Sequence, residues 1–354
     1  MSDSHALFEL STSSNASSSS SSSNQMDIPS EPPLVAQSQS ASLPVSQLVS
    51  GAVLEEGARP AMVIAWSSIE AAATSAITGA LEGHSVPALS SNISKQHYRM
   101  DNIRPPRGDR EKWAIGELEK QWPKQAMDAL ELSVAIELQC QDPASKQLGT
   151  VSYGQEVRSG HRITALVCKE SGGTSSGRVQ IVVGPEHTGF ALADALNNLL
   201  KGGLNQIVNK WKVLTPELAS SGPDSAVLYL NVPITDPLVG KLVTTLHSGL
   251  AEKLEPLQRM PLGMMQLGPG IYGTQLLTSS QYTKMDIGKE GQGSWGAIAS
   301  RAIACAAFDS ANKIRERAGG DEKKLDRYLK DPVFVGKYMQ GYLQKQLNWQ
   351  ITGL

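Results

Sequence analysis

Short β-type runs alternate with helical runs, at uneven spacing, between residues 151 and 318. The β-type runs are rich in Val, Ile and Leu and are bounded by turn sequences such as SGGTSSG and GPDS. Regular βαβ units would give an even alternation and a parallel sheet, whereas this spacing favours antiparallel pairing. The sequence therefore predicts an α+β fold, a largely antiparallel sheet with packed helices, preceded by a disordered Ser-rich N-terminus.

The first part of the chain does not have the composition of a folded segment. Residues 11–25 read STSSNASSSSSSSNQ, and a polar, Pro-interrupted sequence continues to about residue 50. Such a segment cannot bury enough apolar surface to offset its conformational entropy. We expect residues 1–58 to be disordered, either as a flexible linker or fusion remnant or as an unfolded export segment.

The region 59–150 is predicted to be helical. The run PAMVIAWSSIEAAATSAITGALEG has apolar residues at helical spacing and ends on Gly83. A second helical run begins at Glu111, and Pro123 is expected to break it, after which residues 126–139 are compatible with helix or strand. We divide the folded part into this region, an α+β core at 151–318 and a helical tail at 319–354.

Three helices are expected within the core. GPEHTGFALADALNNLLKGG predicts a helix with Pro185 in its first turn, and DPLVGKLVTTLHSGLAEKL predicts one capped by Asp236. SWGAIASRAIACAAFDSANKIRERAGG predicts a long Ala-rich helix. The stretch between the strand runs KWKVL and SAVLYLN is expected to be a loop, in which Asp224 and Ser225 fix the turn.

Composition argues against several classes of protein. The net charge is −2 and the basic residues are scattered, so the chain lacks the basic surface of a nucleic-acid-binding protein. The chain has no apolar run of about eighteen residues, which argues against a membrane span. Its 3 cysteines are far apart and lack nearby partners at metal-ligand spacing. We expect no disulfide framework, no metal and no cofactor.

Familiar catalytic motifs are also missing from the sequence. No Gly-x-Ser-x-Gly elbow and no His-Glu-x-x-His motif occur, which argues against common hydrolases and metalloproteases. The Gly- and Ser-rich stretch GGTSSGR lacks the glycine spacing of a phosphate-binding loop and fits a turn instead.

Four individual residues are candidates for chemistry. Lys212 lies within an apolar β-type run, so it either projects into a cleft or lies on the solvent side of an edge strand. His187 is placed in the first turn of the Pro185 helix, where exposed N–H groups favour a bound anion or a neutral imidazole. Arg178, near the start of a strand, and Arg301, on the Ala-rich helix, are possible anion partners or simple surface charges.

The order of several segments resembles the HopA (HopPsyA) type III effector family. The segments are GRVQIVVGPEHTGFALADALNNLL, WKVL, GPDSAVLYLN, PLVGKLVTTLHSGL, PLGMMQLGPGIYGTQ and GSWGAIASRAI. The resemblance covers about residues 177–313. It implies a secreted effector that acts inside a eukaryotic host cell, with an unfolded secretion signal, a chaperone-binding part near the start of the 59–150 region, and a host protein or phosphopeptide as partner.

The same domain is shared with HopA-like lyases of peptide natural-product pathways, and this implies β-elimination of phosphate from phospho-Ser or phospho-Thr. By the resemblance, Lys212 matches the family's strand lysine and is the candidate base, while Arg178 and Arg301 match arginines that could bind phosphate. His187 as the acid is inferred from its position alone. These roles fit the chemistry, because elimination needs a base for the α-proton and cations for the phosphate.

Three functions remain open at this point. The first is a type III secreted effector, made in the bacterial cytoplasm and exported into a host cell, that either eliminates phosphate or binds a host protein. The second is a cytoplasmic lyase that dehydrates phosphorylated Ser or Thr in a precursor peptide. The third is an interaction domain without catalytic activity.

Overall fold

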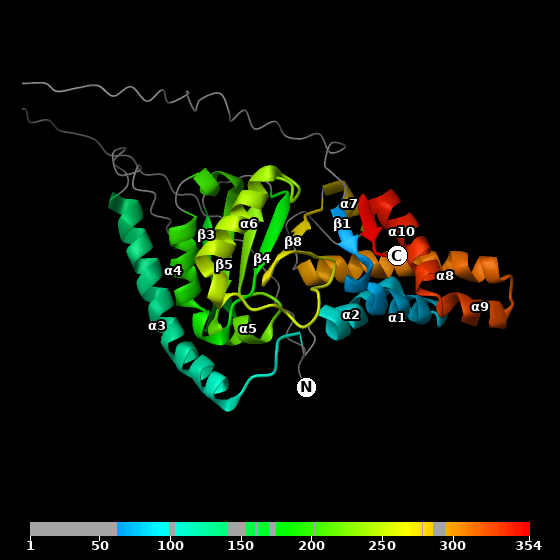
Figure 1. Cartoon of the computed structure of the whole chain (residues 1–354), viewed down its shortest axis with the longest axis horizontal. Coiled ribbons are helices and arrows are strands. Elements are labelled where there is room, and N and C mark those ends of the chain that lie inside the picture. Colours follow the sequence, from blue (N-terminus) through cyan, green and yellow to red (C-terminus); the bar gives the residue numbers. More distant parts are fainter. Residues whose placement is uncertain are drawn as a thin grey trace, which may run out of the picture. The chain divides into compact units, whose positions relative to one another are not determined.

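A computed structural model of the protein describes residues 62–98, 103–139, 153–159, 162–169, 175–200, 203–277, 279–285 and 295–354 (Figure 1). The predicted disordered segment 1–58 lies outside these residues. The described residues belong to one compact unit, Glu56–Leu354. No helix in the described part of the chain is long and apolar enough to cross a membrane.

A seven-stranded antiparallel sheet forms the centre of the fold, in the order β2-β3-β5-β6-β4-β8-β7. Every neighbouring pair is antiparallel, which confirms the predicted α+β class with a largely antiparallel sheet. The strands are β2 (Tyr153–Ser159), β3 (Arg162–Lys169), β4 (Gly177–Ile181), β5 (Val208–Leu214), β6 (Ala226–Leu230), β7 (Met265–Gly268) and β8 (Ile271–Gln275).

One face of this sheet packs against three helices, α3 (Asp109–Gln139), α4 (Phe190–Leu199) and α6 (Pro237–Leu250) (Figure 1). Apolar residues from alternate strand positions meet apolar stripes of the helices there, as the period-2 and period-3.6 patterns require. Trp211, Leu228 and Val179 from the sheet share this buried cluster with Leu196 and Leu246 from the helices. On the opposite face, Tyr272 of β8 belongs to a second buried cluster, and alternation places polar residues of β4 and β5 there.

A second buried cluster joins the two ends of the described chain. It combines α1 (Glu70–Leu81), α2 (Val86–Ile93), α7 (Ser279–Met285), α8 (Trp295–Ala318) and α10 (Pro332–Leu347), with α9 (Glu322–Leu329) packed beside α8 and α10. Short 3-10 or π turns connect several elements: η2 (Trp66–Ser68), η3 (Ser94–Tyr98), η6 (Gly203–Ile207) and η7 (Ala251–Lys253). The 59–150 region, the end of the core and the tail thus contribute to one cluster.

A two-stranded parallel sheet, β1 (Met62–Ala65) with β9 (Trp349–Thr352), also belongs to this cluster. The prediction that the helix begins near residue 59 was wrong for β1, since α1 begins only at Glu70. Met62 and Ile64 are buried and alternate with half-buried residues, which is a strand pattern. The partner strand lies almost three hundred residues away, so local periodicity could not reveal it.

Helix α3 does not break at Pro123, contrary to the prediction, and continues as helix to Gln139. A proline inside a helix removes one backbone hydrogen bond and clashes with the preceding turn. Here packing compensates, because the neighbouring Trp122 is fully buried and its Nε1 donates to the Ile163 carbonyl at 2.9 Å. Tertiary contacts therefore outweigh the local cost.

Two other local predictions also need correction. Residues Pro185–His187 form a separate 3-10 turn, η5, and α4 begins after Gly189, whose φ of 63° interrupts the helix. The expected loop between β5 and β6 contains a short helix, α5 (Pro216–Ser221), capped by the Thr215 hydroxyl. The predicted cap of α6 is confirmed, since Asp236 Oδ1 accepts the Leu238 N–H at 2.8 Å.

Candidate active site

The face of the sheet opposite α3, α4 and α6 carries basic and aromatic side chains on three neighbouring strands. Alternation places Arg178 and Gln180 of β4 on this face, together with Lys210 and Lys212 of β5 and Tyr229 of β6. The residues between them point to the apolar cluster on the other side. We call these five residues the cationic face.

The strand register arranges the cationic face in two rows. In one row, Tyr229 lies between Lys210 on β5 and Arg178 on β4, directly opposite both. In the next row, Lys212 and Gln180 lie on the two sides of Val227. Residues on neighbouring strands of one face are close enough for long side chains to interact both directly and diagonally. Tyr229 is therefore within reach of all three cations.

Tyr229 is the central group of this arrangement. The Lys210 Nζ lies 4.8 Å from the centre of the Tyr229 ring, and the Arg178 Cζ lies 5.9 Å from it. Both distances are in the range of cation–π contacts. Tyr229, Lys210 and Lys212 are half-buried, so the two lysines are partly shielded from water yet accessible, whereas Arg178 is buried.

β5 is an interior strand, between β3 and β6, which excludes the edge-strand alternative for Lys212. Its backbone partners are Val167 on one side and Val227 on the other. The Lys212 side chain therefore lies over the interior of the sheet, on the same face as Lys210 and Arg178, and not at the solvent-exposed edge of the sheet. Arg178 and Lys212, both singled out from the sequence, are thus brought together around Tyr229.

Arg178 is held by an ion pair. Its side chain is buried, and its Nη2 lies 3.0 Å from the Asp224 Oδ2. Among the described residues whose charges act on Tyr229, three are cations, Arg178, Lys210 and Lys212, and one is the Asp224 carboxylate. Lys210 and Lys212 are half-buried and only partly shielded from water, and their charges attract an anion at this place. The cationic face is therefore suited to a dianion.

Two buried polar atoms on β4 lack a hydrogen-bond partner among the described residues, the Arg178 Nε and the Gln180 Oε1. The Gln180 amide nitrogen does have one, since it donates to the Pro223 carbonyl. Buried polar groups are normally paired, so such atoms mark places where a ligand or water completes the site. A phosphate could accept from the guanidinium at Nε.

The electrostatics of Tyr229 and Arg178 are coupled. Burial raises the pKa of the Tyr229 phenol, but Lys212, Arg178 and Lys210 together outweigh burial, so the net pKa lies below that of an ordinary tyrosine. Burial lowers the pKa of Arg178, while Tyr229, Tyr98 and Asp224 raise it to a net value above the usual one. Arg178 therefore stays charged, and the Tyr229 phenol loses its proton more readily than an ordinary tyrosine does.

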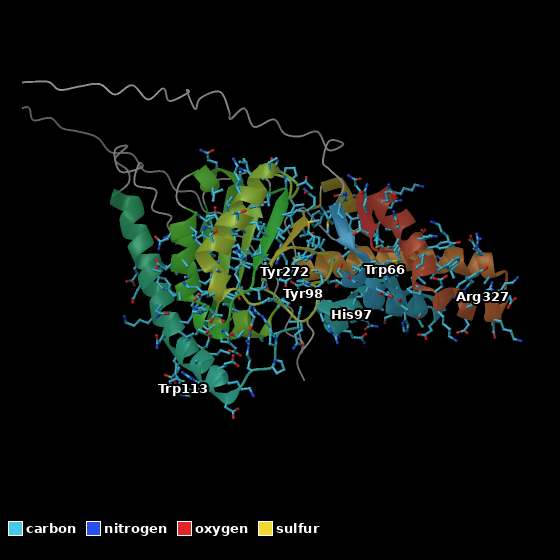
Figure 2. The ribbon with its side chains drawn as sticks, viewed as in Figure 1. Trp66, His97, Tyr98, Trp113, Tyr272 and Arg327 are labelled. Carbon is cyan, nitrogen blue, oxygen red and sulfur yellow. The ribbon has the colours of Figure 1, made fainter. Side chains whose placement is uncertain are left out.

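Tyr98, at the end of η3 and labelled in Figure 2, connects the helical cluster to this site. Arg178 donates a hydrogen bond to the Tyr98 side chain. The Tyr98 ring lies flush against Gly296 in the first turn of α8, where any side chain would overlap the ring. Gly296 thus permits the close contact that places Tyr98 beside Arg178.

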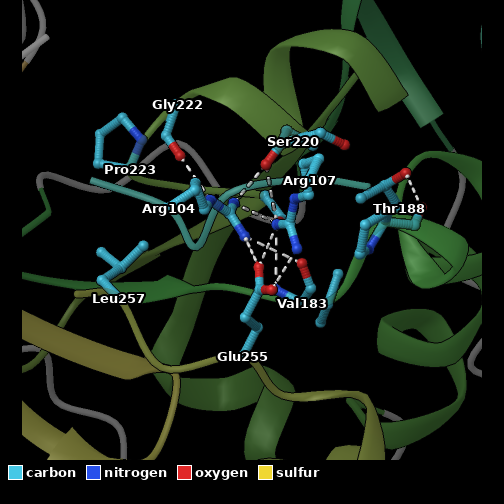
Figure 3. A network of polar contacts seen from close by, with 12 residues as sticks. Arg104, Arg107, Val183, Thr188, Ser220, Gly222, Pro223, Glu255 and Leu257 are labelled. Atoms are coloured by element: carbon cyan, nitrogen blue, oxygen red, sulfur yellow. Dashed lines mark hydrogen bonds and ion pairs between the residues drawn. The ribbon is translucent and has the colours of Figure 1, made fainter. Parts of the chain in front are cut away.

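A second network of polar contacts fixes the turn next to the site (Figure 3). The buried Arg104 donates to the carbonyls of Gly222, Val183 and Ala219, to Ser225 Oγ at 2.9 Å and to Glu255 Oε2 at 2.9 Å. Arg107 forms a two-contact pair with Glu255. Because the hydrogen bonds of Arg104 go to acceptors of the protein itself, we infer that its role is structural and that it positions Ser225 and the adjacent Asp224. We call Arg104, Arg107 and Glu255 the Arg104 clasp.

The structure places His187 away from the cationic face. It lies in η5, which packs against α3 and α5, and its Nε2 is 3.6 Å from the Glu186 Oε1. The chain from Arg178 to Val183 is extended, so at roughly 3.3 Å per residue the backbones of Arg178 and Val183 lie about 16 Å apart. His187 comes after Val183 in the chain. No contact found in the described part of the chain joins His187 to Lys212.

Arg301 lies in the helical cluster. Its Nε donates to the Met285 carbonyl at 3.0 Å, and its charge acts on Tyr342 of α10. Arg301 follows Gly296 by five residues, which turns it by about 140° from the side of α8 that faces Tyr98. The described contacts therefore bring Arg178 and Lys212 together, and they place Arg301 and His187 elsewhere.

Sequence reasoning missed four members of the site: Gln180, Lys210, Tyr229 and Tyr98. The alternation within VNKWKVL contains the signal for Lys210, because it lies two residues before Lys212 and must share its face. Tyr229 follows from pairing β5 with β6. Tyr98 has no such signal, since its contact with Arg178 joins residues eighty positions apart.

No protein-family model and no curated protein matches the chain. Among solved structures, an effector protein from Pseudomonas syringae pv. syringae strain 61 matches with 17% identity and a TM-score of 0.40, over 79% of this chain and 93% of that one. An effector protein from Pseudomonas syringae pv. tomato strain DC3000 matches with 18% identity and a TM-score of 0.36, over 71% and 95%.

A third solved structure, the type III effector and phosphothreonine lyase OspF from Shigella flexneri, matches with 15% identity and a TM-score of 0.26, over 34% of this chain and 69% of that one. Similarities of this size carry no argument about function. The cationic face is the feature that bears on the chemistry of this chain.

Proposed function

We propose that the cationic face binds a phosphorylated Ser or Thr side chain of a peptide and eliminates its phosphate. The observation that carries this proposal is the position of Arg178 and Lys210 on either side of Tyr229, with Lys212 in the next row and an Arg178 Nε that lacks a hydrogen-bond partner among the described residues. A phosphate monoester carries close to two negative charges near neutral pH and offers three acceptor oxygens. The charge and the donors of the site match this group.

The residues divide into two roles. Arg178 and Lys210, on either side of Tyr229, bind the phosphate, with Arg178 oriented by Asp224. Lys212, in the next row, takes the α-proton as a neutral amine. The α-carbon–hydrogen bond breaks, its electron pair forms the Cα–Cβ double bond, and the Cβ–oxygen bond breaks so that phosphate leaves with that electron pair. The products are a dehydrated residue and inorganic phosphate.

The setting of this activity is part of the same proposal. The Ser-rich start and the resemblance to the HopA effector family support a secreted bacterial effector, exported by a type III system with the help of a chaperone, that acts on a host protein. If residues 1–60 fused to a reporter show no type III-dependent export, the effector setting is wrong. The lyase activity would then point to a precursor peptide as substrate.

The activity is tested with a phosphothreonine peptide, whose product is identified by mass spectrometry. A lyase yields a dehydrated peptide, whereas a phosphatase yields the free hydroxyl. Lys212→Met should remove the activity, while Lys241→Met should retain it, because Lys241 is an exposed residue of α6 on the apolar side of the sheet. Full activity in Lys212→Met would contradict the role of Lys212 as the base.

A further inference from the structure

Elimination from a phosphate monoester raises a second requirement, which concerns the leaving group. A dianionic ester that loses its phosphate without a proton would release a trianion, which is a poor leaving group. A proton donated to the bridging oxygen during bond cleavage removes this difficulty. His187, the acid expected from the sequence, has its described contacts with Glu186 and lies beyond the end of β4.

Tyr229 occupies the place where such a proton is needed. It lies between Lys210 and Arg178 in the sheet register, with the Lys210 Nζ 4.8 Å and the Arg178 Cζ 5.9 Å from the centre of its ring. A phosphate bound by both cations would therefore lie next to Tyr229. Lys212 is on the same face, one row along, and is its diagonal neighbour.

We propose that Tyr229 is the general acid of the elimination, a catalytic residue that donates its phenolic proton to the bridging oxygen of the leaving phosphate. This inference rests on the proposed function and assigns a further residue to it. The phenol is half-buried and surrounded by Lys210 and Lys212 of β5, Arg178 of β4 and Asp224 of the turn before β6.

The protons balance within the Tyr229–Lys212 pair. In the reactive form, Tyr229 is a phenol and Lys212 an amine. Lys212 takes the α-proton and becomes an ammonium ion, while Tyr229 gives its proton to the departing oxygen and becomes a phenolate. The phosphate leaves as the monohydrogen dianion. Proton transfer from the Lys212 ammonium to the Tyr229 phenolate then restores the reactive form without any further reactant.

The electrostatics of the site support this cycle. The pKa of the Tyr229 phenol is raised by burial but lowered more by the three cations, among which Lys212 has the largest effect. While Lys212 is neutral, Arg178 and Lys210 still lower the pKa of the phenol, and the Lys212 ammonium group that forms when the α-proton is taken stabilises the phenolate.

The test compares two leaving groups. One peptide carries phosphoserine and a matched peptide carries serine O-sulfate, whose sulfate leaves readily without a proton. Tyr229→Phe keeps the ring and its contacts with the cations but lacks the proton. We expect Tyr229→Phe to lower kcat by about 10²- to 10⁴-fold on phosphoserine and to change kcat far less on the sulfate ester, while Lys212→Met loses activity on both.

The outcomes separate a failure of the proposed function from a failure of the acid role of Tyr229. An inactive wild-type protein contradicts the proposed function and this assignment with it. An active wild type whose Tyr229→Phe variant retains kcat on phosphoserine, or loses kcat equally on both peptides, contradicts the acid role alone. Inorganic phosphate affinity, measured by calorimetry, is expected to be unchanged in Tyr229→Phe, since the binding cations remain in place.

A second measurement does not depend on that variant. With 3-fluorotyrosine incorporated at position 229 alone, the ¹⁹F signal reports ionisation of the phenol. Lys212→Met is expected to shift this titration to higher pH, because it removes the cation that acts most strongly on the phenol. The same titration curve in both proteins would show that the two groups are not coupled and would overturn the proposal.

Discussion

The Lys210 Nζ lies 4.8 Å from the centre of the Tyr229 ring, on the face of the sheet that the helices α3, α4 and α6 leave uncovered. This contact follows from backbone register, because Lys210 and Tyr229 are direct cross-strand partners. The same register places Arg178 on the other side of Tyr229. The site is thus built by strand pairing and does not depend on a flexible loop.

Lys210 should control the pH dependence of the reaction. Its ammonium group lowers the pKa of the Tyr229 phenol, so Lys210→Met raises that pKa. Tyr229 must keep its proton to act as the acid, and a raised pKa keeps the phenol protonated to higher pH. We expect the alkaline limb of the kcat/KM profile to move to higher pH in Lys210→Met and to stay in place in Lys241→Met. A shift to lower pH would contradict this electrostatic account.

Removing only one member of the Arg178–Asp224 ion pair should destabilise the protein more than neutralising both members. Arg178→Met leaves the Asp224 carboxylate without its cation in a buried position, which costs about 3–5 kcal/mol of unfolding free energy. Asp224→Asn in the same protein removes the unpaired charge and should recover a large part of that loss. Urea denaturation of the two single variants and the double variant measures this. Strictly additive losses would show that the two residues do not act as a pair.

The Arg104 clasp should be a major source of stability. Arg104→Met removes one of the two cations that pair with Glu255 and leaves the buried carbonyls of Val183, Ala219 and Gly222 without this donor, and we expect a loss of about 3–5 kcal/mol. Arg110→Met is the matched control, since Arg110 is exposed on α3 and should change stability by less than about 0.5 kcal/mol. Thermal unfolding of both variants tests this, and equal melting temperatures would show that Arg104 is not structural.

Glu255 gives the clasp a pH dependence of definite sign. Burial raises the pKa of its carboxyl, but hydrogen bonds and charge from Arg107 and Arg104 outweigh burial and bring the net pKa below the ordinary value of 4.5. A lowered carboxyl pKa adds stability above pH 4.5, and this contribution is lost as the pH falls through the folded-state pKa. Glu255→Gln should therefore flatten the acid side of the stability profile. An unchanged acid side would contradict this.

His187 and Arg301 should not be needed for the chemistry. The structure gives His187 contacts with Glu186, and Arg301 a contact with the Met285 carbonyl. We expect His187→Ala and Arg301→Gln to retain wild-type kcat/KM on a phosphothreonine peptide, once corrected for the folded fraction. A loss as large as that of Lys212→Met in either variant would return that residue to the site.

Local sequence patterns predicted the α+β class, the strand with Lys212 and the Asp236 cap, because these depend on periodicity and on short-range hydrogen bonds. They failed at β1 and at Pro123, where a distant partner strand or a buried Trp122 decides the outcome. For the site, alternation could place Arg178 and Lys212 on strand faces. It could not show that the two strands flank β6, and so it could not find Tyr229.

The most direct test of the central claim, that the cationic face eliminates phosphate, is the stoichiometry of the products from one phosphothreonine peptide. Peptide mass and released phosphate are measured in the same reaction. The account predicts one dehydrated threonine for each phosphate released by the wild-type protein, and neither product with Lys212→Met. Release of phosphate with a threonine hydroxyl in the peptide, or no release by the folded wild-type protein, would contradict it.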